Sequence, residues 1–161
     1  MNIFFRIFIA ITVLAGTAYA DTCKLSTEIL DQMSERYIEL IDDAGESVLL
    51  QVKVADESNE QAAGFQHICP QTIESTAILF VFEEPKSPLF HMRNVHASLD
   101  IAFIDAEGRV GDVQLMLEEF TTGKSKLYPS GVSAKYALEV RQGYFSEHNI
   151  SAKNSWMKID E

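Results

Sequence analysis

The sequence predicts one mainly-β domain, a compact barrel or sandwich of about seven or eight short strands with one or two short helices. Short runs alternate apolar and polar residues, as half-buried strands do, and Gly, Asp, Asn or Pro residues separate them. No repeat, low-complexity tract or linker interrupts residues 21–161. We therefore expect these residues to form a single domain.

The first half of this domain begins with a hairpin and a short helix. Residues 36–42 (RYIELID) alternate, a DDAGE turn follows, and residues 47–55 (SVLLQVKVA) form the returning strand. Ser58 is expected to cap a helix, with Gln61 at the capping-box position and Gly64 at its end. A polar stretch before the hairpin, residues 24–33, also has helical character.

The second half contains most of the expected strands. A long polar loop is predicted at residues 121–133, and residues 142–150 form a short helix or turn. Strands are predicted at residues 78–82, 89–95, 99–105, 109–117, 136–140 and 155–160.

The N-terminal residues 1–20 have the pattern of a secretory signal peptide. Arg6 precedes a short apolar run, and Ala18-Tyr19-Ala20 matches the small-residue cleavage site. The apolar run is shorter than the ~20 residues that a membrane span needs, so an N-terminal anchor is the weaker alternative. We expect cleavage after Ala20 and export to the periplasm, with the cell exterior as the alternative.

The chain is acidic, with a formal net charge of −11 at pH 7. Such a charge repels the phosphate backbone of nucleic acids and anionic lipid surfaces. Neither is therefore an expected partner, and we expect a small molecule or another protein of the cell envelope instead.

The two cysteines, Cys23 and Cys69, are expected to form a disulfide after export. The bond would tie the mature N-terminus to the body of the domain. Redox-active or metal-binding thiols are the alternative, but no CxxC or clustered spacing supports them.

Several strings, in this order, resemble the uncharacterised DUF192 family, and the resemblance covers about residues 35–155. It implies a small, mainly-β, barrel-like domain and no settled activity. The strings are Gly64-Phe65-Gln66, ILFVFEEP at 78–85, FHMRNV at 90–95, SLDIAFID at 98–105 and YPSGVSAKYALEVRQG at 128–143.

The chain also departs from the family strings at five positions. If the family uses those side chains to hold a ligand, this member differs in specificity. Where the family strings have Met, Arg, Trp, Thr and Pro, this chain has Gln66, Ile68, His91, Val95 and Ser98.

Asp100 is the strongest single signal for a site. It lies in the apolar run LDIAFID, where both strand faces are mostly apolar, so its carboxylate is expected to be buried. A buried carboxylate needs a partner, and Arg93 and Asn94 on the preceding strand are the nearest candidates. The cluster is either a binding site with a shifted Asp pKa or an internal network that fixes strand register.

Glu139 is a second acid within an apolar strand, YALEV. By alternation it shares a face with Ala137 and Arg141, and Ser130 would contribute a hydroxyl from the preceding loop. We expect these groups to extend the polar pocket around Arg93, Asn94 and Asp100. A hydrolase that uses Asp100 or Glu139 as general base is the alternative, and no residue is assigned as catalytic.

A metal site would have to rest on His91, Met92 and His96. His with Met in an exported protein suits copper, and His pairs also suit zinc. On a strand, however, His91 points away from both Met92 and His96, so a complete ligand set is not expected. Copper or zinc handling is therefore the weakest alternative, and no cofactor is expected.

Taken together, these features favour a binding or accessory domain over an enzyme. The candidate binding residues are Arg93, Asn94, Asp100, Ser130 and Glu139.

Overall fold

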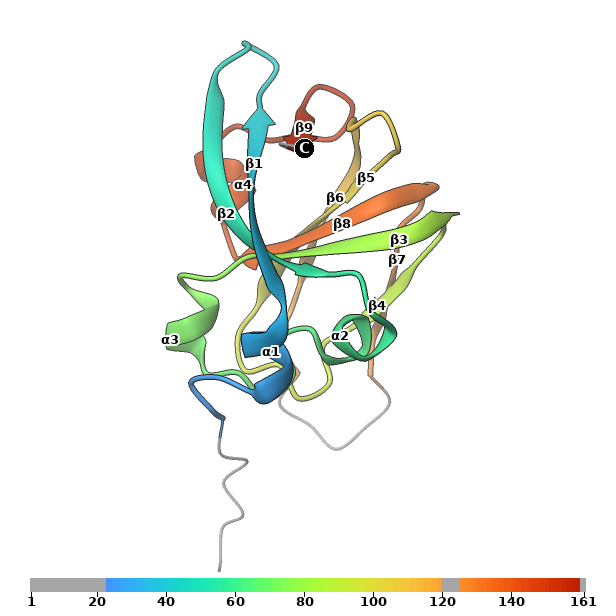
Figure 1. Cartoon of the computed structure of the whole chain (residues 1–161). Coiled ribbons are helices and arrows are strands. Elements are labelled where there is room, and N and C mark those ends of the chain that lie inside the picture. The colour runs from blue at the N-terminus through green and yellow to red at the C-terminus, as the bar shows by residue number, and fades with distance from the viewer. Residues whose placement is uncertain (1–22, 120–124, 160–161) are drawn as a thin grey trace, which may run out of the picture.

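The computed structural model describes residues 23–119 and 125–159, and it confirms the mainly-β prediction (Figure 1). The predicted signal peptide, residues 1–20, lies outside the described residues. The strands are β1 (Ser34–Ile41), β2 (Ser47–Ala55), β3 (Ile78–Lys86), β4 (Leu89–His91), β5 (Leu99–Ile104), β6 (Val110–Met116), β7 (Leu127–Pro129), β8 (Ala134–Arg141) and β9 (Trp156–Ile159). The helices are α1 (Glu28–Gln32), α2 (Ser58–Ala63), α3 (Pro70–Ile73) and α4 (Tyr144–Glu147).

Seven of the described strands form one sheet in the order β6-β5-β8-β3-β2-β1-β9. The sheet curls into a barrel, because its two edge strands approach each other at the Arg109–Trp156 bridge. The seam is held by hydrogen bonds from Met157 N–H to the Gly108 carbonyl (2.7 Å) and from Val110 N–H to the Ser155 carbonyl (2.9 Å). Gly108 has a φ of +90°, and an added Cβ would collide with the Met157 carbonyl oxygen. The closure therefore requires glycine at this turn.

The two faces of the central strands build two separate cores. Ala102, Ile104, Leu138 and Val140 point into the barrel, whereas their neighbours along each strand point outward. The barrel interior contains Ile38, Leu40, Val52, Val54, Leu79, Ala102, Ile104, Val110, Leu138, Val140, Phe145 and Met157. The outer core includes Ile78, Phe80, Phe82, Leu99, Ile101, Phe103 and Ala137 from the sheet.

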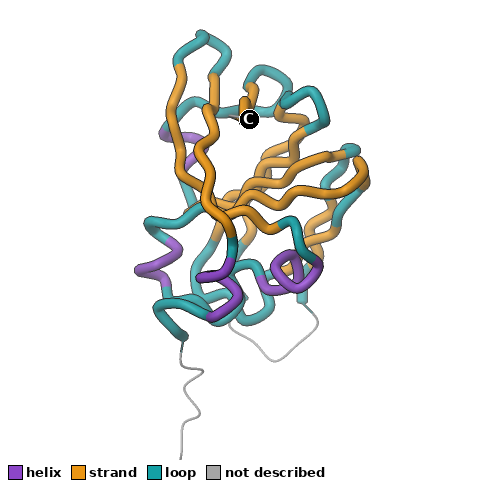
Figure 2. The backbone as a smooth tube through the Cα atoms, in the orientation of Figure 1, coloured by secondary structure: helices purple, strands orange, loops and turns teal. Residues whose placement is uncertain are grey.

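An outer layer covers this outward face of β3, β8 and β5. Figures 1 and 2 show α1, α2 and α3 gathered at one end of the molecule, with the small β4–β7 sheet beside them. Leu30, Phe65, Ile68 and Met92 from this layer are buried in the outer core. One face of β3 and β8 is thus packed against helices, loops and the small β4–β7 sheet rather than against the barrel interior.

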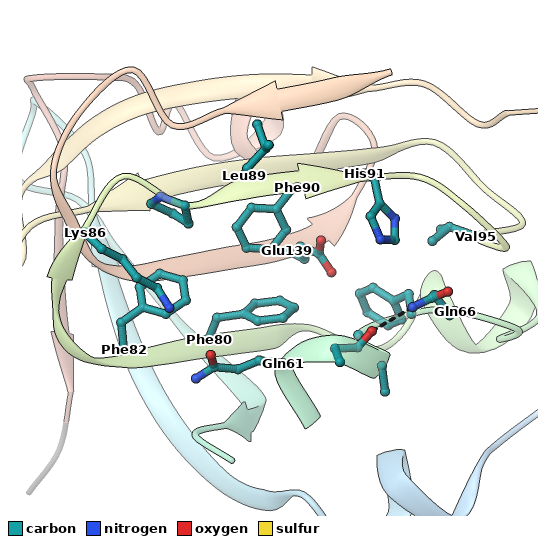
Figure 3. A pocket seen from close by; sticks show the side chains of 15 residues that line it. Gln61, Gln66, Phe80, Phe82, Lys86, Leu89, Phe90, His91, Val95 and Glu139 are labelled. Atoms are coloured by element: carbon teal, nitrogen blue, oxygen red, sulfur yellow. Dashed lines mark hydrogen bonds between the residues drawn. The ribbon is translucent and has the colours of Figure 1, made fainter. Parts of the chain in front are cut away.

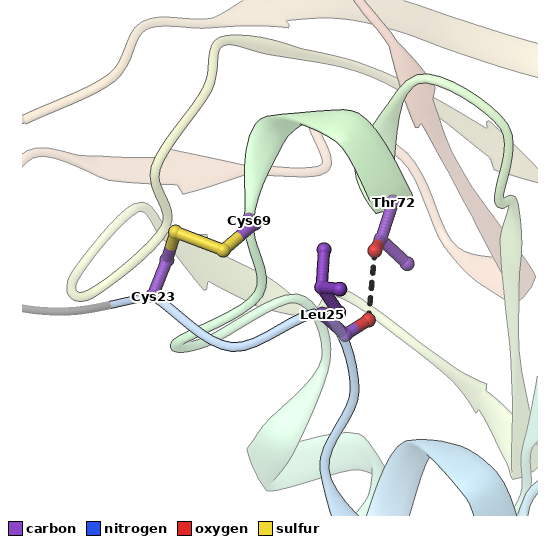
Figure 4. Close-up of a disulfide and its surroundings, with 4 residues drawn as sticks. All are labelled: Cys23, Leu25, Cys69 and Thr72. Carbon is purple, nitrogen blue, oxygen red and sulfur yellow. Dashed lines mark hydrogen bonds between the residues drawn. A yellow bond between two sulfur atoms is a disulfide. The ribbon is translucent and has the colours of Figure 1, made fainter.

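The predicted disulfide is present and ties the N-terminal segment to α3 (Figure 4). Beside it, Lys24 N–H donates to the His67 carbonyl (2.7 Å) and Cys69 N–H donates to the Lys24 carbonyl (2.8 Å). The Thr72 hydroxyl adds a hydrogen bond to the Leu25 carbonyl (2.7 Å). A disulfide in a domain of this kind indicates a protein outside the reducing cytoplasm.

One predicted strand, residues 89–95, is wrong in its extent and in its partner. The strand ends at His91, because Asn94 adopts a φ of +59° and Val95 N–H donates back to the Met92 carbonyl (3.1 Å). β4 then pairs with β7, whereas β5 lies between β6 and β8. Arg93 and Asn94 are therefore not on a strand next to Asp100.

The remaining differences are local. The capping box of α2 uses Glu57 and Glu60, one residue before the expected Ser58 and Gln61. The predicted polar loop contains β7, and α3 was not predicted. Because these two elements are three and four residues long, they carry no usable periodicity. No helix among residues 23–119 and 125–159 is long and apolar enough to cross a membrane.

Candidate functional site

A cavity of about 420 Å³ lies between the outer face of the sheet and the outer layer (Figure 3). It is bounded by α2, β3, β4 and β8, and its size falls within the usual range of ligand pockets, ~300–1,000 Å³. Its walls are formed by apolar residues, four of them phenylalanines, together with five polar side chains. The aromatic residues are Phe65, Phe80, Phe82 and Phe90, and the polar lining residues are Gln61, Gln66, Lys86, His91 and Glu139.

Strand alternation places the aromatic walls. Phe80 and Phe82 occupy successive outward positions of β3, and Phe90 reaches toward them from β4. The rings of Phe80 and Phe90 meet edge to face with centroids 5.0 Å apart, and Phe90 also lies 5.7 Å from Phe103. Such aromatic pairs are favourable beyond the area they bury. The walls are therefore held in place before any ligand arrives.

Gly64, which ends α2, brings the backbone close to the floor of the cavity. It has a φ of +46°, and an added Cβ would lie 3.4 Å from Phe80 Cζ and 3.6 Å from Glu139 Oε2. A side chain at this position would be strained and would occupy space above the carboxyl group. Glycine keeps the space above Glu139 open.

Glu139 forms the floor of the cavity and points into it (Figure 3). On β8 it lies between Ile78 of β3 and Ile101 of β5, and only 5 % of its surface is exposed. Its carboxyl group has no hydrogen bond or ion pair with any residue that the structure describes. Burial raises the pKa of Glu139 to about 8, so the group is protonated at neutral pH.

Lys86 and His91 are the other ionisable side chains of the lining. The Lys86 ammonium lies 4.2 Å from the centre of the Phe82 ring, a cation–π contact. His91 projects into the cavity, and its Nδ1 accepts a hydrogen bond from the backbone N–H of Arg93 (3.3 Å). In the neutral ring this hydrogen bond leaves the proton on Nε2.

The two glutamines of the lining are already used within the protein. Gln61 Nε2 donates to the Val81 carbonyl (2.9 Å), and Gln66 Nε2 donates to the Ala62 carbonyl (2.7 Å). Gln66 Oε1 accepts from the Asn94 amide (3.3 Å). Among the described lining side chains, unused hydrogen-bonding capacity therefore remains at Glu139, Lys86, His91 and the Gln61 Oε1 atom.

Asp100, the most prominent sequence candidate, lies on the opposite face of the sheet from Glu139. It pairs with Val140 across the β5–β8 ladder, whereas Glu139 pairs with Ile101, so the two carboxyl groups point to different sides. The carboxylate accepts the Gly143 N–H (2.9 Å) and is also hydrogen-bonded by the Phe145 backbone. Burial raises the pKa of Asp100, and these backbone hydrogen bonds oppose the rise. The structure does not bring Asp100 and Glu139 into one site.

The other predicted binding residues also fall outside the cavity. The Arg93 side chain is exposed, and Asn94 contributes only its hydrogen bond to Gln66. Ser130 is fully buried; its hydroxyl donates to the Val132 carbonyl (2.6 Å), and its N–H donates to the Pro88 carbonyl (3.1 Å). The expected cluster of Arg93, Asn94 and Asp100 is not formed, and among the five candidates only Glu139 lines the cavity.

The three residues considered for a metal site lie apart, although the strand ends at His91 and alternation does not extend to Met92 and His96. Met92 is fully buried in the outer core, whereas His91 lines the cavity. His96 lies in the following loop, away from the cavity lining. Within the described part of the chain, no three His, Cys, Asp or Glu side chains are grouped closely enough to hold a metal ion.

The sequence reasoning missed the aromatic walls and Lys86. A signal for them was present, since the strings that resemble DUF192 converge on this cavity from α2, β3, β4 and β8. Three of the five departures from those strings, Gln66, His91 and Val95, also line it.

Comparisons with known proteins give a family and a fold. A crystal structure of a putative transcription regulator from Sinorhizobium meliloti 1021 matches with a TM-score of 0.70 and 20% identity, over 79% of this chain and 95% of that chain. A crystal structure of a protein of unknown function from Novosphingobium aromaticivorans DSM 12444 matches with a TM-score of 0.70 and 19% identity, over 89% and 99%. At this identity both show the fold alone.

Comparison of the sequence with curated proteins gave no match. The family model of DUF192, "Uncharacterized ACR", matches residues 39–156, which is most of the chain and includes the cavity residues of every contributing strand and helix. The protein therefore belongs to the DUF192 family.

Proposed function

We propose that the protein is an exported, periplasmic domain that binds a small molecule in the Glu139 cavity. One observation carries the proposal: a carboxyl group that is 5 % exposed, has no partner among the described residues and opens into an aromatic-lined cavity. Leaving a buried polar group without a hydrogen bond costs about 1–3 kcal/mol. A ligand that supplies the missing hydrogen bond would recover this free energy.

The composition of the lining supports the same proposal. Ligand pockets are typically apolar or aromatic with a few polar groups that fix orientation, and this cavity has four phenylalanines beside a few polar side chains. Gln66, His91 and Val95 differ from the family strings and line the cavity together. Differences at such positions are expected to change which ligand is bound and to leave the fold intact.

Export is supported by the signal-peptide pattern and by the Cys23–Cys69 disulfide. Expression of the full chain in a Gram-negative bacterium, followed by fractionation and mass spectrometry, tests it. The expected product is a periplasmic protein that begins at Asp21 and contains no free thiol. A cytoplasmic product that retains residues 1–20 would contradict export.

A thermal-shift screen of the mature protein tests the binding proposal. The library should contain small acids, amines and neutral compounds, aromatic and aliphatic. A ligand present at about a hundred times its Kd stabilises the folded state by about 2.7 kcal/mol, which is several degrees in Tm. At least one compound is expected to give such a shift.

Two aromatic substitutions locate the binding site. Phe90→Ala removes a wall of the cavity and is expected to abolish the ligand-induced shift. Tyr144→Ala is the matched control, because Tyr144 is also partly buried and stacks on another ring, that of His148, outside the cavity. A shift that persists in the Phe90→Ala protein, or a library without a single stabilising compound, would contradict the proposal.

Proton transfer by Glu139 is a second candidate, favoured by its pKa of about 8. A general acid or base works best when its pKa lies near the operating pH. If the wild type converts a bound ligand and the Glu139→Gln protein binds it without converting it, the protein is an enzyme. Binding without turnover would leave the protein as a binding domain.

A further inference from the structure

Three polar groups of the cavity present hydrogen-bond donors. Lys86 carries an ammonium group, and His91 presents an Nε2–H because its Nδ1 accepts from the Arg93 N–H. The protonated carboxyl group of Glu139 presents an O–H. Gln66 is engaged within the protein through both its donor and its acceptor, and Gln61 through its donor. The acceptors left in the described lining side chains are Gln61 Oε1 and the carbonyl of the Glu139 carboxyl group, so donors outnumber acceptors.

The charge of the cavity has the opposite sign to the charge of the protein. The chain has a net charge of −11, yet its cavity is lined by one neutral acid and one ammonium. Among the described residues Lys86 has no ion pair, and its ammonium is held only by the Phe82 ring. This unpaired positive charge favours a ligand with a single negative charge.

We propose that the cavity binds a monocarboxylate with an apolar, aromatic body. The ligand carboxylate accepts hydrogen bonds from the Glu139 hydroxyl and from His91, and its body packs against Phe80, Phe82 and Phe90. The Lys86 ammonium, at the Phe82 end of the cavity, attracts the anion through space (Figure 3). Hydrogen bonds to an ionised acceptor are about twice as strong as neutral ones. This inference names the ligand class of the proposed binding function and rests on that function.

An organic amine fits the same cavity less well. Aromatic walls can hold a cation, but the face of Phe82 already carries the Lys86 ammonium at 4.2 Å. Glu139 would have to release its proton to become the counter-ion. An amine would therefore meet a like charge and no anion at neutral pH.

The two ligand classes differ in their pH dependence. The titratable groups around Glu139 are Lys86 from β3 and His91 from β4, and the α2 residues of the lining do not titrate. Arg141 is two residues after Glu139 on β8 and shares its strand face, but it is ion-paired with Glu74 and Glu147. When Glu139 ionises, a bound carboxylate loses a donor and faces a like charge, whereas an amine gains a counter-ion. Carboxylate affinity should thus fall as pH rises through about 8, and amine affinity should increase.

Calorimetric titration with three matched compounds tests the inference. Phenylpropanoate, phenylpropanamide and phenylpropylamine share one body and differ in the head group. At pH 7 phenylpropanoate is expected to bind most tightly. At pH 9 only about a tenth of Glu139 keeps its proton, so phenylpropanoate should bind about tenfold more weakly than at pH 7. In the Glu139→Gln protein this pH dependence should disappear, because an amide does not ionise.

Two lysine substitutions test the role of the ammonium. Lys86→Gln is expected to weaken the binding of phenylpropanoate about fivefold and to leave the binding of phenylpropanamide unchanged, as fits attraction by one exposed charge. Lys126→Gln is the matched control, because Lys126 lies over the Tyr128 ring at 4.6 Å and outside the cavity. The Lys126→Gln substitution should change the affinity for neither compound.

Tighter binding of phenylpropylamine than of phenylpropanoate, or an affinity for phenylpropanoate that rises with pH, would overturn the inference and leave the binding function standing. Binding by none of the three compounds also overturns the carboxylate class. The binding function itself fails only if the wider thermal-shift library gives no ligand that depends on Phe90.

Discussion

Asp100 and Glu139 are two buried acids on neighbouring strands, and they have opposite surroundings. Asp100 faces the end of the barrel interior, where the Gly143 N–H and the Phe145 backbone satisfy its oxygens. Glu139 faces the outer layer, where no described group satisfies it and a cavity lies in front of it. A buried acid with backbone partners holds the fold together. A buried acid that opens into a cavity without a partner is available to a ligand.

The largest expected effect is the pH dependence that Glu139 gives to stability. Its pKa is about 8 in the folded state, against 4.5 in the unfolded chain, so the folded protein holds this proton more tightly. The contribution is complete below pH 4.5 and is lost as pH rises through about 8. The wild type should lose a few kcal/mol over this window, with about 5 kcal/mol as the ceiling.

Urea unfolding of the wild type and the Glu139→Gln protein, at intervals from pH 4 to pH 9, measures this contribution. The two curves are expected to diverge with rising pH, and the Gln variant should be the more stable one above pH 8. Parallel curves would show that Glu139 is not held in its neutral form.

Removing the disulfide should have the next largest effect on stability. It also tests whether the outer layer and the barrel unfold separately. Replacing Cys23 and Cys69 together by Ala opens a loop of 46 residues and should destabilise the protein by about 3–4 kcal/mol. The bond joins the N-terminal segment to α3, so the outer layer should loosen first. Backbone amide hydrogens should exchange faster in α1 to α3, and their protection in β5 and β8 should be unchanged. Uniform loss of protection would mean that the two regions unfold as one.

Asp100→Asn tests the other side of the sheet. An amide can direct only one oxygen at the backbone N–H groups that Asp100 now accepts, so stability should fall by about 1–2 kcal/mol. Ligand binding in the cavity should not change, because Asp100 and Glu139 point to opposite faces. Loss of binding at unchanged stability would place Asp100 in the functional site instead.

The hairpin and the long strands could be predicted from sequence because their periodicity is local. β1, β2, β5, β6 and β8 all fall within a few residues of their expected bounds. The pairing of β4 with β7 could not be predicted, since it depends on the left-handed Asn94, which ends β4 early, and on a partner strand of three residues. The sequence shows a strand's two faces but not its neighbours.

The same limit explains the candidate site. The sequence showed both Asp100 and Glu139 as acids within apolar strands, and it predicted burial for Asp100. Which of them faces the aromatic cavity depends on Gly64, Phe80 and Phe90, which three separate segments bring together. The convergence of the family strings on one place was the available signal. It becomes usable only when the sheet order is known.

The smallest expected effect is that of Arg93→Ala, and it tests where the site ends. Arg93 was predicted to face Asp100, but its side chain is exposed, and only its backbone N–H makes a described contact, with His91 Nδ1. Surface substitutions of this kind usually change stability by less than about 0.5 kcal/mol. The variant keeps the backbone N–H and hence the orientation of His91. Ligand affinity should therefore equal that of the wild type, measured by the same calorimetric titration. A loss of more than about threefold would extend the site beyond the cavity to the turn after β4.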